Sequence, residues 1–139
     1  MERLSILFPM VALATLTFAV LLLIPYRRFR AGMRGEISGA DFRYGESERV
    51  PPEVRLPNRN LMNLLELPVL FYVVCLMMFV TEQVDGRGLA VAWAYVGLRV
   101  GHSVVHVTYN RVSHRLVFFA LSNVALIVLW THLFRNLAR

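Results

Sequence analysis

Four long apolar runs dominate the pattern of hydrophobic and polar positions along this chain. They cover about residues 6–24, 61–80, 89–107 and 116–133. A bilayer core of about 30 Å takes roughly 20 residues of α-helix, so each run is of a length suited to crossing it. Backbone groups in lipid must pair within their own segment, and the runs are therefore predicted to be helices. The pattern predicts an all-α membrane protein, with a four-transmembrane-helix bundle as a single domain over 1–139.

The polar connections between these runs predict the orientation of the chain. The first connection, about 26–58, is long and holds seven arginines, whereas the second is short and the third carries Arg111. Basic residues near the spans favour the cytoplasmic side, which places the first and third connections there and both termini outside. Pro25 closes the first apolar run. Pro57–Asn58 is predicted to start the second helix, because asparagine is a favoured N-cap residue.

Composition agrees with a membrane protein and excludes several other classes. Apolar residues make up 57% of the chain and charged residues 17%, whereas soluble domains have about 45–50% and about 25%. A disordered chain would be less hydrophobic, and the single Cys75 excludes a disulfide scaffold. The net charge is +6 and all fifteen basic residues are arginine. They lie between the apolar runs and do not form the basic stripe of a nucleic-acid-binding protein.

Polar side chains inside the second and third runs each follow one helical face, with spacings of three or four residues. Ionisable residues in a bilayer cost about 2.5–3.5 kcal/mol each on insertion scales, so they normally face the interior of a bundle. The two faces consist of Arg59, Asn63 and Glu66 in the second run and Tyr95, Arg99, His102, His106 and Tyr109 in the third. Together they predict one polar pocket that opens to the cytoplasm.

One antiparallel register sets the two polar faces directly against each other. It pairs residues by depth, namely Glu66 with Arg99, Asn63 with His102, and Arg59 with His106. Glu66 and Arg99 would then form an ion pair at membrane depth, either as a lock between two helices or as part of a ligand site. Arg59 lies at the start of the second run, where free backbone N–H groups favour an anion. The expected ligand is polar and anionic, with several carboxylates.

Two weaker patterns occur in the third run. A stripe of small residues, which lets helices approach closely in lipid, consists of Ala90, Ala94, Gly97 and Gly101. His102 and His106 form an H-x-x-x-H pair, which with Glu66 would give two histidines and one carboxylate for a metal. Metal enzymes that use such pairs in membranes have many more histidines than the four of this chain. We therefore expect no metal.

The segment Arg59–Pro68, with its R-x-x-x-N-x-x-E pattern, resembles the signature of the MAPEG family, the membrane-associated proteins in eicosanoid and glutathione metabolism. Arg99 followed by His102 and His106, and Arg115 at the start of the fourth run, are also similar to that family. The resemblance covers the whole chain and suggests a bacterial member in the inner membrane with periplasmic termini. It implies a homotrimer with active sites between neighbouring subunits, near the cytoplasmic face.

The resemblance also implies a role for each candidate residue, with glutathione as the cosubstrate. The residues that would bind it are Arg59, Asn63, Glu66, Arg99, His102 and His106, with Arg28 or Arg27 assisting from a neighbour. Arg115 would be the catalytic residue that stabilises the thiolate, and Arg111 is the alternative for this role. A fixed cation lowers the pKa of a thiol from about 8.5 and so makes it a nucleophile.

The implied function is glutathione-dependent transfer or peroxidase chemistry on lipophilic electrophiles or lipid hydroperoxides. Glutathione-using members of the family carry tyrosines where this chain has His102 and His106. The alternative is a non-catalytic trimeric membrane protein that binds another anionic small molecule or a lipid headgroup. A shared fold does not by itself decide between these functions.

Overall fold

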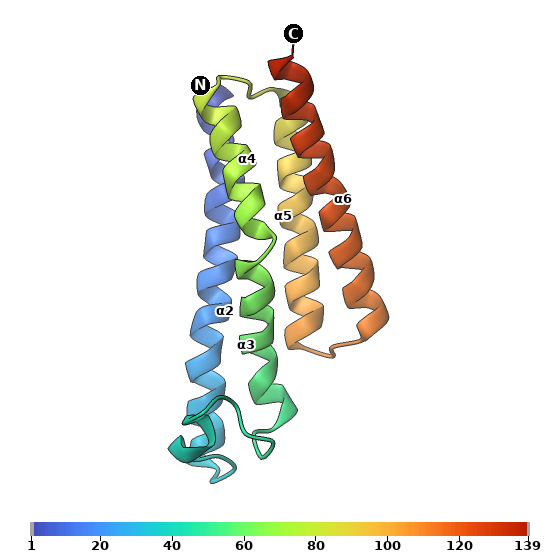
Figure 1. Cartoon of the computed structure of the whole chain (residues 1–139). Helices are drawn as coiled ribbons and strands as arrows, with labels where there is room; N and C mark the ends of the chain where they lie inside the picture. The colour runs from blue at the N-terminus through green and yellow to red at the C-terminus, as the bar shows by residue number, and fades with distance from the viewer. Residues whose placement is uncertain (1, 139) are drawn as a thin grey trace.

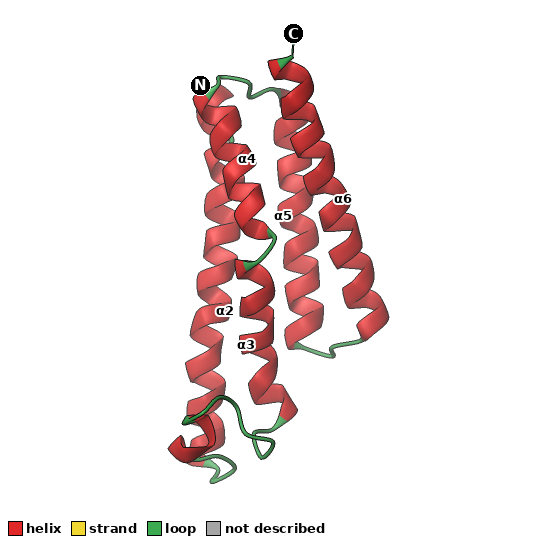
Figure 2. Cartoon of the chain, in the orientation of Figure 1, coloured by secondary structure: helices red, strands yellow, loops and turns green. Residues whose placement is uncertain are grey.

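A computed structural model describes residues 2–138 of the chain, and these residues form helices joined by short connections and one longer loop, without a β-strand (Figure 2). The elements are α1 (Glu2–Ser5), α2 (Leu7–Met33), the 3₁₀-helix η1 (Gly39–Phe42), α3 (Pro52–Leu65), α4 (Pro68–Val80), α5 (Gly86–Val107) and α6 (Val112–Leu137). Four stretches are long and apolar enough to cross a membrane, with α3 and α4 together forming the second. The predicted all-α membrane bundle is confirmed.

The helices pack as two neighbouring pairs. α2 lies along α3 and α4, and α5 lies along α6, with further contacts of α5 to α2 and α3 (Figure 1). Both termini lie at one end of the bundle. At the other end, α2 and α3 reach beyond the turn between α5 and α6 and carry the long first connection (Figure 1). This end carries the arginine-rich segment for which the sequence predicts a cytoplasmic location.

Two prolines lie inside helices and do not end or start them. α2 continues through Pro25 to Met33, and α3 starts at Pro52 with Pro57 in its interior. The expected helix start at Pro57–Asn58 is therefore wrong. Pro57 has no N–H to give to the Glu53 carbonyl four residues earlier. Arg27 supplies the missing donor, since its Nη1 lies 2.6 Å from that carbonyl oxygen.

The second membrane span is broken into two helices, where a single helix was expected over 61–80. α3 ends at Leu65 and α4 begins at Pro68, and Glu66 has a non-helical ψ of −105°. Pro68 cannot donate a backbone hydrogen bond, and its ring would crowd the Leu64 carbonyl in a continuous helix. The break takes Glu66 off the helical face that it was expected to share with Asn63.

The long first connection is folded and closes one end of the bundle. A small apolar cluster forms around Ala31, Val50 and Val54, separate from the main core. The Asp41 carboxylate accepts hydrogen bonds from Ser38 N–H and from the hydroxyls of Ser38 and Ser47. The backbone hydrogen bond from Ser38, followed by the two hydroxyl bonds, lowers the pKa of Asp41 below its usual value. The loop therefore has a fixed shape.

Candidate functional site

A cavity of about 480 Å³ lies between α3, α5 and α6, on the side of the bundle that faces the arginine-rich end. Small-molecule sites commonly have volumes of about 300–1,000 Å³. The cavity is lined by five residues that the sequence singled out, and these are Arg59, Asn63, His102, His106 and Arg115. The remaining lining is apolar and consists of Met62, Val112, Leu116 and Phe119. Three helices thus bring five of the eight candidate residues together.

α3 contributes a cation and a hydrogen-bond acceptor to the cavity. Asn63 donates from Nδ2 to the Arg59 carbonyl at 3.0 Å, one turn earlier on the helix. This contact fixes the amide, so that Oδ1 is the atom left to accept a hydrogen bond from a ligand. The guanidinium of Arg59 makes no hydrogen bond or ion pair within residues 2–138. It is therefore available to an anion.

α6 contributes Arg115 from its first turn. Arg115 donates from Nη1 to Asn110 Oδ1 at 2.8 Å, and Asn110 belongs to the turn that joins α5 to α6. Arg111, the alternative for the same role, is the N-cap residue of α6 and is not among the residues that line the cavity. Of the two arginines, Arg115 is the one whose position suits contact with a bound ligand.

α5 contributes His102 and His106, which are both buried. Their rings meet edge to face with centroids 5.5 Å apart. The Nδ1 atom of each ring is buried and has no hydrogen-bond partner among the described residues. No group of three or more potential metal ligands occurs within residues 2–138, so Glu66 does not join this pair. The two-histidine, one-carboxylate arrangement considered from the sequence is not assembled.

Arg99 lies behind the cavity and does not line it. Its side chain is fully buried, and Nη2 donates to the Asn63 carbonyl at 2.6 Å. In a continuous helix that carbonyl would accept from Leu67, but the break before Pro68 leaves it to Arg99. Nε and Nη1 have no partner among the described residues. Arg99, which belongs to α5, thus supplies the hydrogen bond that the last turn of α3 lacks.

The expected ion pair between Glu66 and Arg99 is not formed. Glu66 lies at the helix break with its side chain exposed on the single chain, while Arg99 uses the Asn63 carbonyl. A second contact joins the same helices, from Ser103 Oγ to Asn60 Oδ1 at 3.3 Å, and both residues are buried. Facing residues are therefore offset from the predicted register. Asn60 was not singled out from the sequence. The signal that could have found it is its polar side chain, which lies one turn before Asn63 on the same helix.

Arg28 does not reach this cavity within its own chain. Its Nη2 lies 3.0 Å from Glu46 Oε1, and its guanidinium stacks 4.3 Å from the centroid of the Phe42 ring. Both partners belong to the folded first connection. Arg28 therefore anchors that loop to the end of α2 in a single chain.

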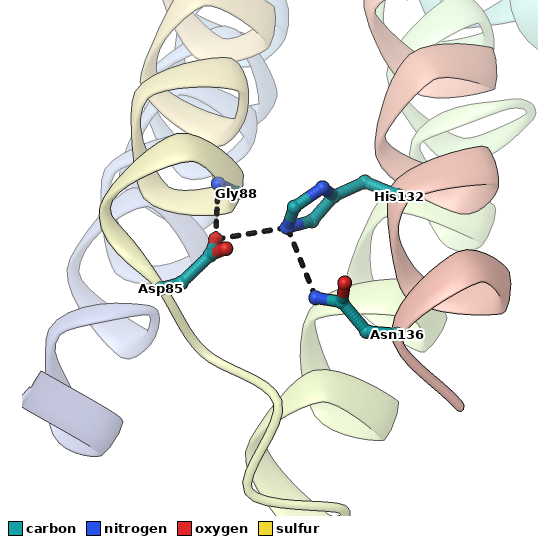
Figure 3. A network of polar contacts seen from close by, with 4 residues as sticks. All are labelled: Asp85, Gly88, His132 and Asn136. Atoms are coloured by element: carbon teal, nitrogen blue, oxygen red, sulfur yellow. Dashed lines mark hydrogen bonds and ion pairs between the residues drawn. The ribbon is translucent and has the colours of Figure 1, made fainter. Parts of the chain in front are cut away.

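A separate polar network lies between the α4–α5 connection and α6 (Figure 3), and that connection is at the end of the bundle where the termini lie (Figure 1). Asp85 caps α5 by accepting from Gly88 N–H at 2.7 Å, and the same oxygen lies 2.8 Å from His132 Nε2 on α6. Asn136 extends the network to His132 at 3.2 Å. Partial burial raises the pKa of Asp85, but the contacts from Gly88 and His132 outweigh it and hold the pKa below its usual value. This network joins the α4–α5 connection to α6.

Comparison with known proteins identifies the family of the chain. The comparisons with curated proteins and with solved structures give no match. The model of the MAPEG family matches residues 6–135, which is nearly the whole chain. The match includes the second and third membrane stretches, nearly all of the first and fourth, and every residue of the cavity. The match places the chain among the membrane proteins of glutathione and eicosanoid metabolism. This integral, multi-pass membrane protein therefore belongs to the MAPEG family.

Proposed function

We propose that this protein is a membrane-bound, glutathione-dependent transferase or peroxidase that acts on lipophilic electrophiles or lipid hydroperoxides. The observation that carries the proposal is the cavity between α3, α5 and α6. It unites Arg59, Asn63 and Arg115 from two helices at one end of the bundle. Family membership supports glutathione as the cosubstrate of this site.

The groups of glutathione fit the donors and acceptors of the cavity. Glutathione carries two carboxylates, an ammonium group, two amides and a thiol. The unpaired guanidinium of Arg59 suits a carboxylate, which arginine can bind through two parallel hydrogen bonds. Asn63 Oδ1 can accept from the ammonium group or from an amide N–H. Arg115, on the opposite wall, is then the cation for the thiol.

Arg115 would act by stabilising the thiolate of bound glutathione. A thiol with a pKa of about 8.5 is mostly protonated at neutral pH, and a fixed cation lowers that value. In the transfer reaction, the thiol proton leaves to water and the sulfur forms a bond to an electrophilic carbon. The leaving group departs with its electron pair. In the peroxidase reaction, two glutathione molecules reduce one hydroperoxide to an alcohol and water and become a disulfide.

The apolar part of the cavity suits a lipophilic second substrate. Val112 and Leu116 are exposed on the single chain, at 64% and 61%, and they continue the cavity onto the surface of α6. α6 is one of the stretches that can cross a membrane. A hydrophobic acceptor could therefore approach the sulfur from the bilayer, and glutathione from the aqueous side.

We further propose that the working protein is a homotrimer whose sites lie between subunits. Glu66 is exposed on the single chain and forms no hydrogen bond or ion pair with another residue among 2–138. A neighbouring subunit would supply the cation for Glu66, and Arg28 or Arg27 of that subunit is the candidate. We also propose a location in the inner membrane of a bacterium, with the site facing the cytoplasm and both termini in the periplasm. The distribution of arginines supports this orientation.

Glutathione binding by detergent-solubilised protein tests this proposal directly. Because a ligand that binds the folded state stabilises it by mass action, millimolar glutathione should raise the melting temperature. Arg115→Ala should keep most of that shift but lose turnover with a model electrophile, whereas Arg111→Ala serves as the matched control and should keep both. If millimolar glutathione leaves the melting temperature unchanged, the proposal is wrong.

The cavity also favours a second candidate function, the non-catalytic binding of another anion. Its lining offers arginine and histidine side chains and no carboxylate, so an anionic small molecule or a lipid headgroup fits the same charges. Native mass spectrometry of the purified protein would separate the two functions. Co-purified anionic lipid or metabolite, without thiol-transfer activity, would support this candidate. Glutathione together with turnover would reject it.

A further inference from the structure

The turn between α5 and α6 holds Asn110 in a backbone conformation that side chains rarely adopt. Its φ is +48°, in the left-handed region, and among the described non-glycine residues only Glu82 shares a positive φ. Asparagine tolerates this region better than most residues, but the conformation still costs free energy. Strained residues that persist in folded proteins concentrate at functional sites. Asn110 lies directly beside one, since Arg115 in the next turn lines the cavity.

The backbone of the turn does not need the asparagine side chain. Asn110 N–H donates to the Val105 carbonyl at 2.8 Å, which closes the end of α5 through main-chain atoms alone. Glycine would adopt the same φ with less strain, because it has no Cβ. The side chain therefore has to be explained by what it contacts.

That contact is the candidate catalytic arginine. Asn110 Oδ1 accepts from Arg115 Nη1 at 2.8 Å, and no other described residue holds this guanidinium by a hydrogen bond or ion pair. Arginine has a long and flexible side chain, so one fixed acceptor greatly restricts where its charge lies. The left-handed backbone at Asn110 is what brings this acceptor within reach of Arg115, five residues later.

The acceptor is also neutral, which matters for a cation that must stabilise a thiolate. A carboxylate at this position would bind Arg115 more strongly but would cancel its charge. An amide oxygen orients the guanidinium and leaves the positive charge for the ligand. The second arginine of the cavity is Arg59, and the rings of His102 and His106 also line it.

We propose that Asn110 is a positioning residue for Arg115: its strained backbone and neutral side-chain oxygen aim the arginine charge at the sulfur of the bound thiol. This inference rests on the proposed function for the identity of the ligand. The positioning itself concerns the chain alone, so it can be tested with and without glutathione.

Three variants separate positioning from folding. Asn110→Gly keeps the left-handed turn and removes the acceptor. Asn110→Asp keeps an acceptor oxygen and adds a negative charge. Glu82→Gly is the matched control, because it relieves the other left-handed residue, in the connection between α4 and α5, and loses only an exposed ion pair with Arg3. All three should purify as folded protein with melting temperatures close to that of the wild type.

The thiolate of bound glutathione can be followed by its ultraviolet absorbance as the pH is raised. In Asn110→Gly, the apparent pKa of the bound thiol should rise and kcat should fall by about tenfold, with little change in KM for glutathione. Asn110→Asp should raise that pKa at least as far. Glu82→Gly should leave the titration unchanged. If the apparent pKa of the bound thiol in Asn110→Gly is the same as in the wild type, the inference is wrong.

A second measurement needs no glutathione. The side-chain N–H signal of Arg115 in ¹⁵N-labelled protein reports how firmly its guanidinium is held. Asn110→Gly should sharpen this signal as the side chain becomes mobile, and Glu82→Gly should not. If the wild type neither binds glutathione nor forms a thiolate, the proposed function fails. In that case an unchanged Arg115 signal in Asn110→Gly would overturn the positioning as well, and a mobile one would support it.

Discussion

Replacing Gly101 by alanine should push α5 and α6 apart beside the cavity. A Cβ at Gly101 would lie 2.5 Å from Cε1 of Phe118 on α6, and 2.9 and 3.0 Å from two further atoms of that ring. Real Cβ contacts are not this short, so the ring or the helix must move. Gly97, one turn earlier on α5, has no atom within 4 Å of the same position. The two glycines of the G-x-x-x-G pattern thus form a matched pair.

The two changes should have opposite effects on stability. Overpacking a well-packed contact costs about 1–3 kcal/mol, while alanine is favoured over glycine inside a helix by about 1 kcal/mol. Gly101→Ala should therefore lose up to about 2 kcal/mol of unfolding free energy after that gain is subtracted. In Gly97→Ala the new Cβ meets no close neighbour. The unfolding free energy should therefore stay the same or rise by about 1 kcal/mol through helix propensity alone.

Unfolding by sodium dodecyl sulfate in mixed micelles, followed by circular dichroism, measures both variants under one condition. Gly101→Ala should unfold at a lower detergent fraction and should bind glutathione more weakly, because α5 and α6 form two walls of the cavity. A stable Gly101→Ala protein would show that Phe118 relaxes without cost. If Gly97→Ala loses more than about 1 kcal/mol of unfolding free energy, Gly97 is packed against another subunit. That result would refute the explanation from the contacts of one chain.

Three further predictions concern other polar contacts of the bundle. Arg99→Ala should lower the unfolding free energy by about 1–3 kcal/mol, because it leaves the partly buried Asn63 carbonyl without a donor; equilibrium unfolding checks this, with Arg111→Ala as the control. Arg27→Ala should also destabilise the protein, since two carbonyls at the ends of α3 and α5 lose their donor; thermal unfolding checks it. The pKa of Asp85 is lowered in the folded state, so its stabilising contribution is complete above the unfolded value of about 3.9 and is lost as the pH falls through the lower folded value. Melting temperatures measured down that acidic range should therefore fall less steeply in Asp85→Asn than in the wild type.

The membrane spans could be predicted from the sequence because the requirement is one of length and polarity. A bilayer of about 30 Å demands long apolar helices, and the chain offers four runs of suitable length. Four residues of the cavity could also be predicted, because helices have a regular period. Arg59 and Asn63 are one turn apart, as are His102 and His106, so each pair shares a helical face. The helices place both pairs on the walls of one cavity.

The offset of the helices could not be predicted from spacing alone. The predicted register assumed a continuous second helix, which would keep Glu66 on the face of Asn63. Pro68 breaks that helix, and the freed Asn63 carbonyl takes the donor that was assigned to the Glu66 carboxylate. Asn110 was missed for a related reason. Its role depends on a left-handed backbone in a turn, and no periodic pattern marks that conformation.

The helix break changes the surroundings of both Arg99 and Glu66. The register predicted from the sequence assumed a continuous second helix and paired Arg99 with the Glu66 carboxylate. The break instead satisfies Arg99 in part through a backbone carbonyl, and it leaves Glu66 exposed and outside the lining of the cavity. An ionisable side chain exposed at this depth of a membrane span is costly in lipid, so it favours a polar partner, and none of the residues 2–138 pairs with it by a hydrogen bond or ion pair. A neighbouring subunit or a bound ligand is what can supply it, and crosslinking of a cysteine at Glu66 to one at Arg28 across purified oligomers would show which. Efficient crosslinking supports a site shared between subunits, and its absence in an oligomer that binds glutathione would leave Glu66 to the ligand alone.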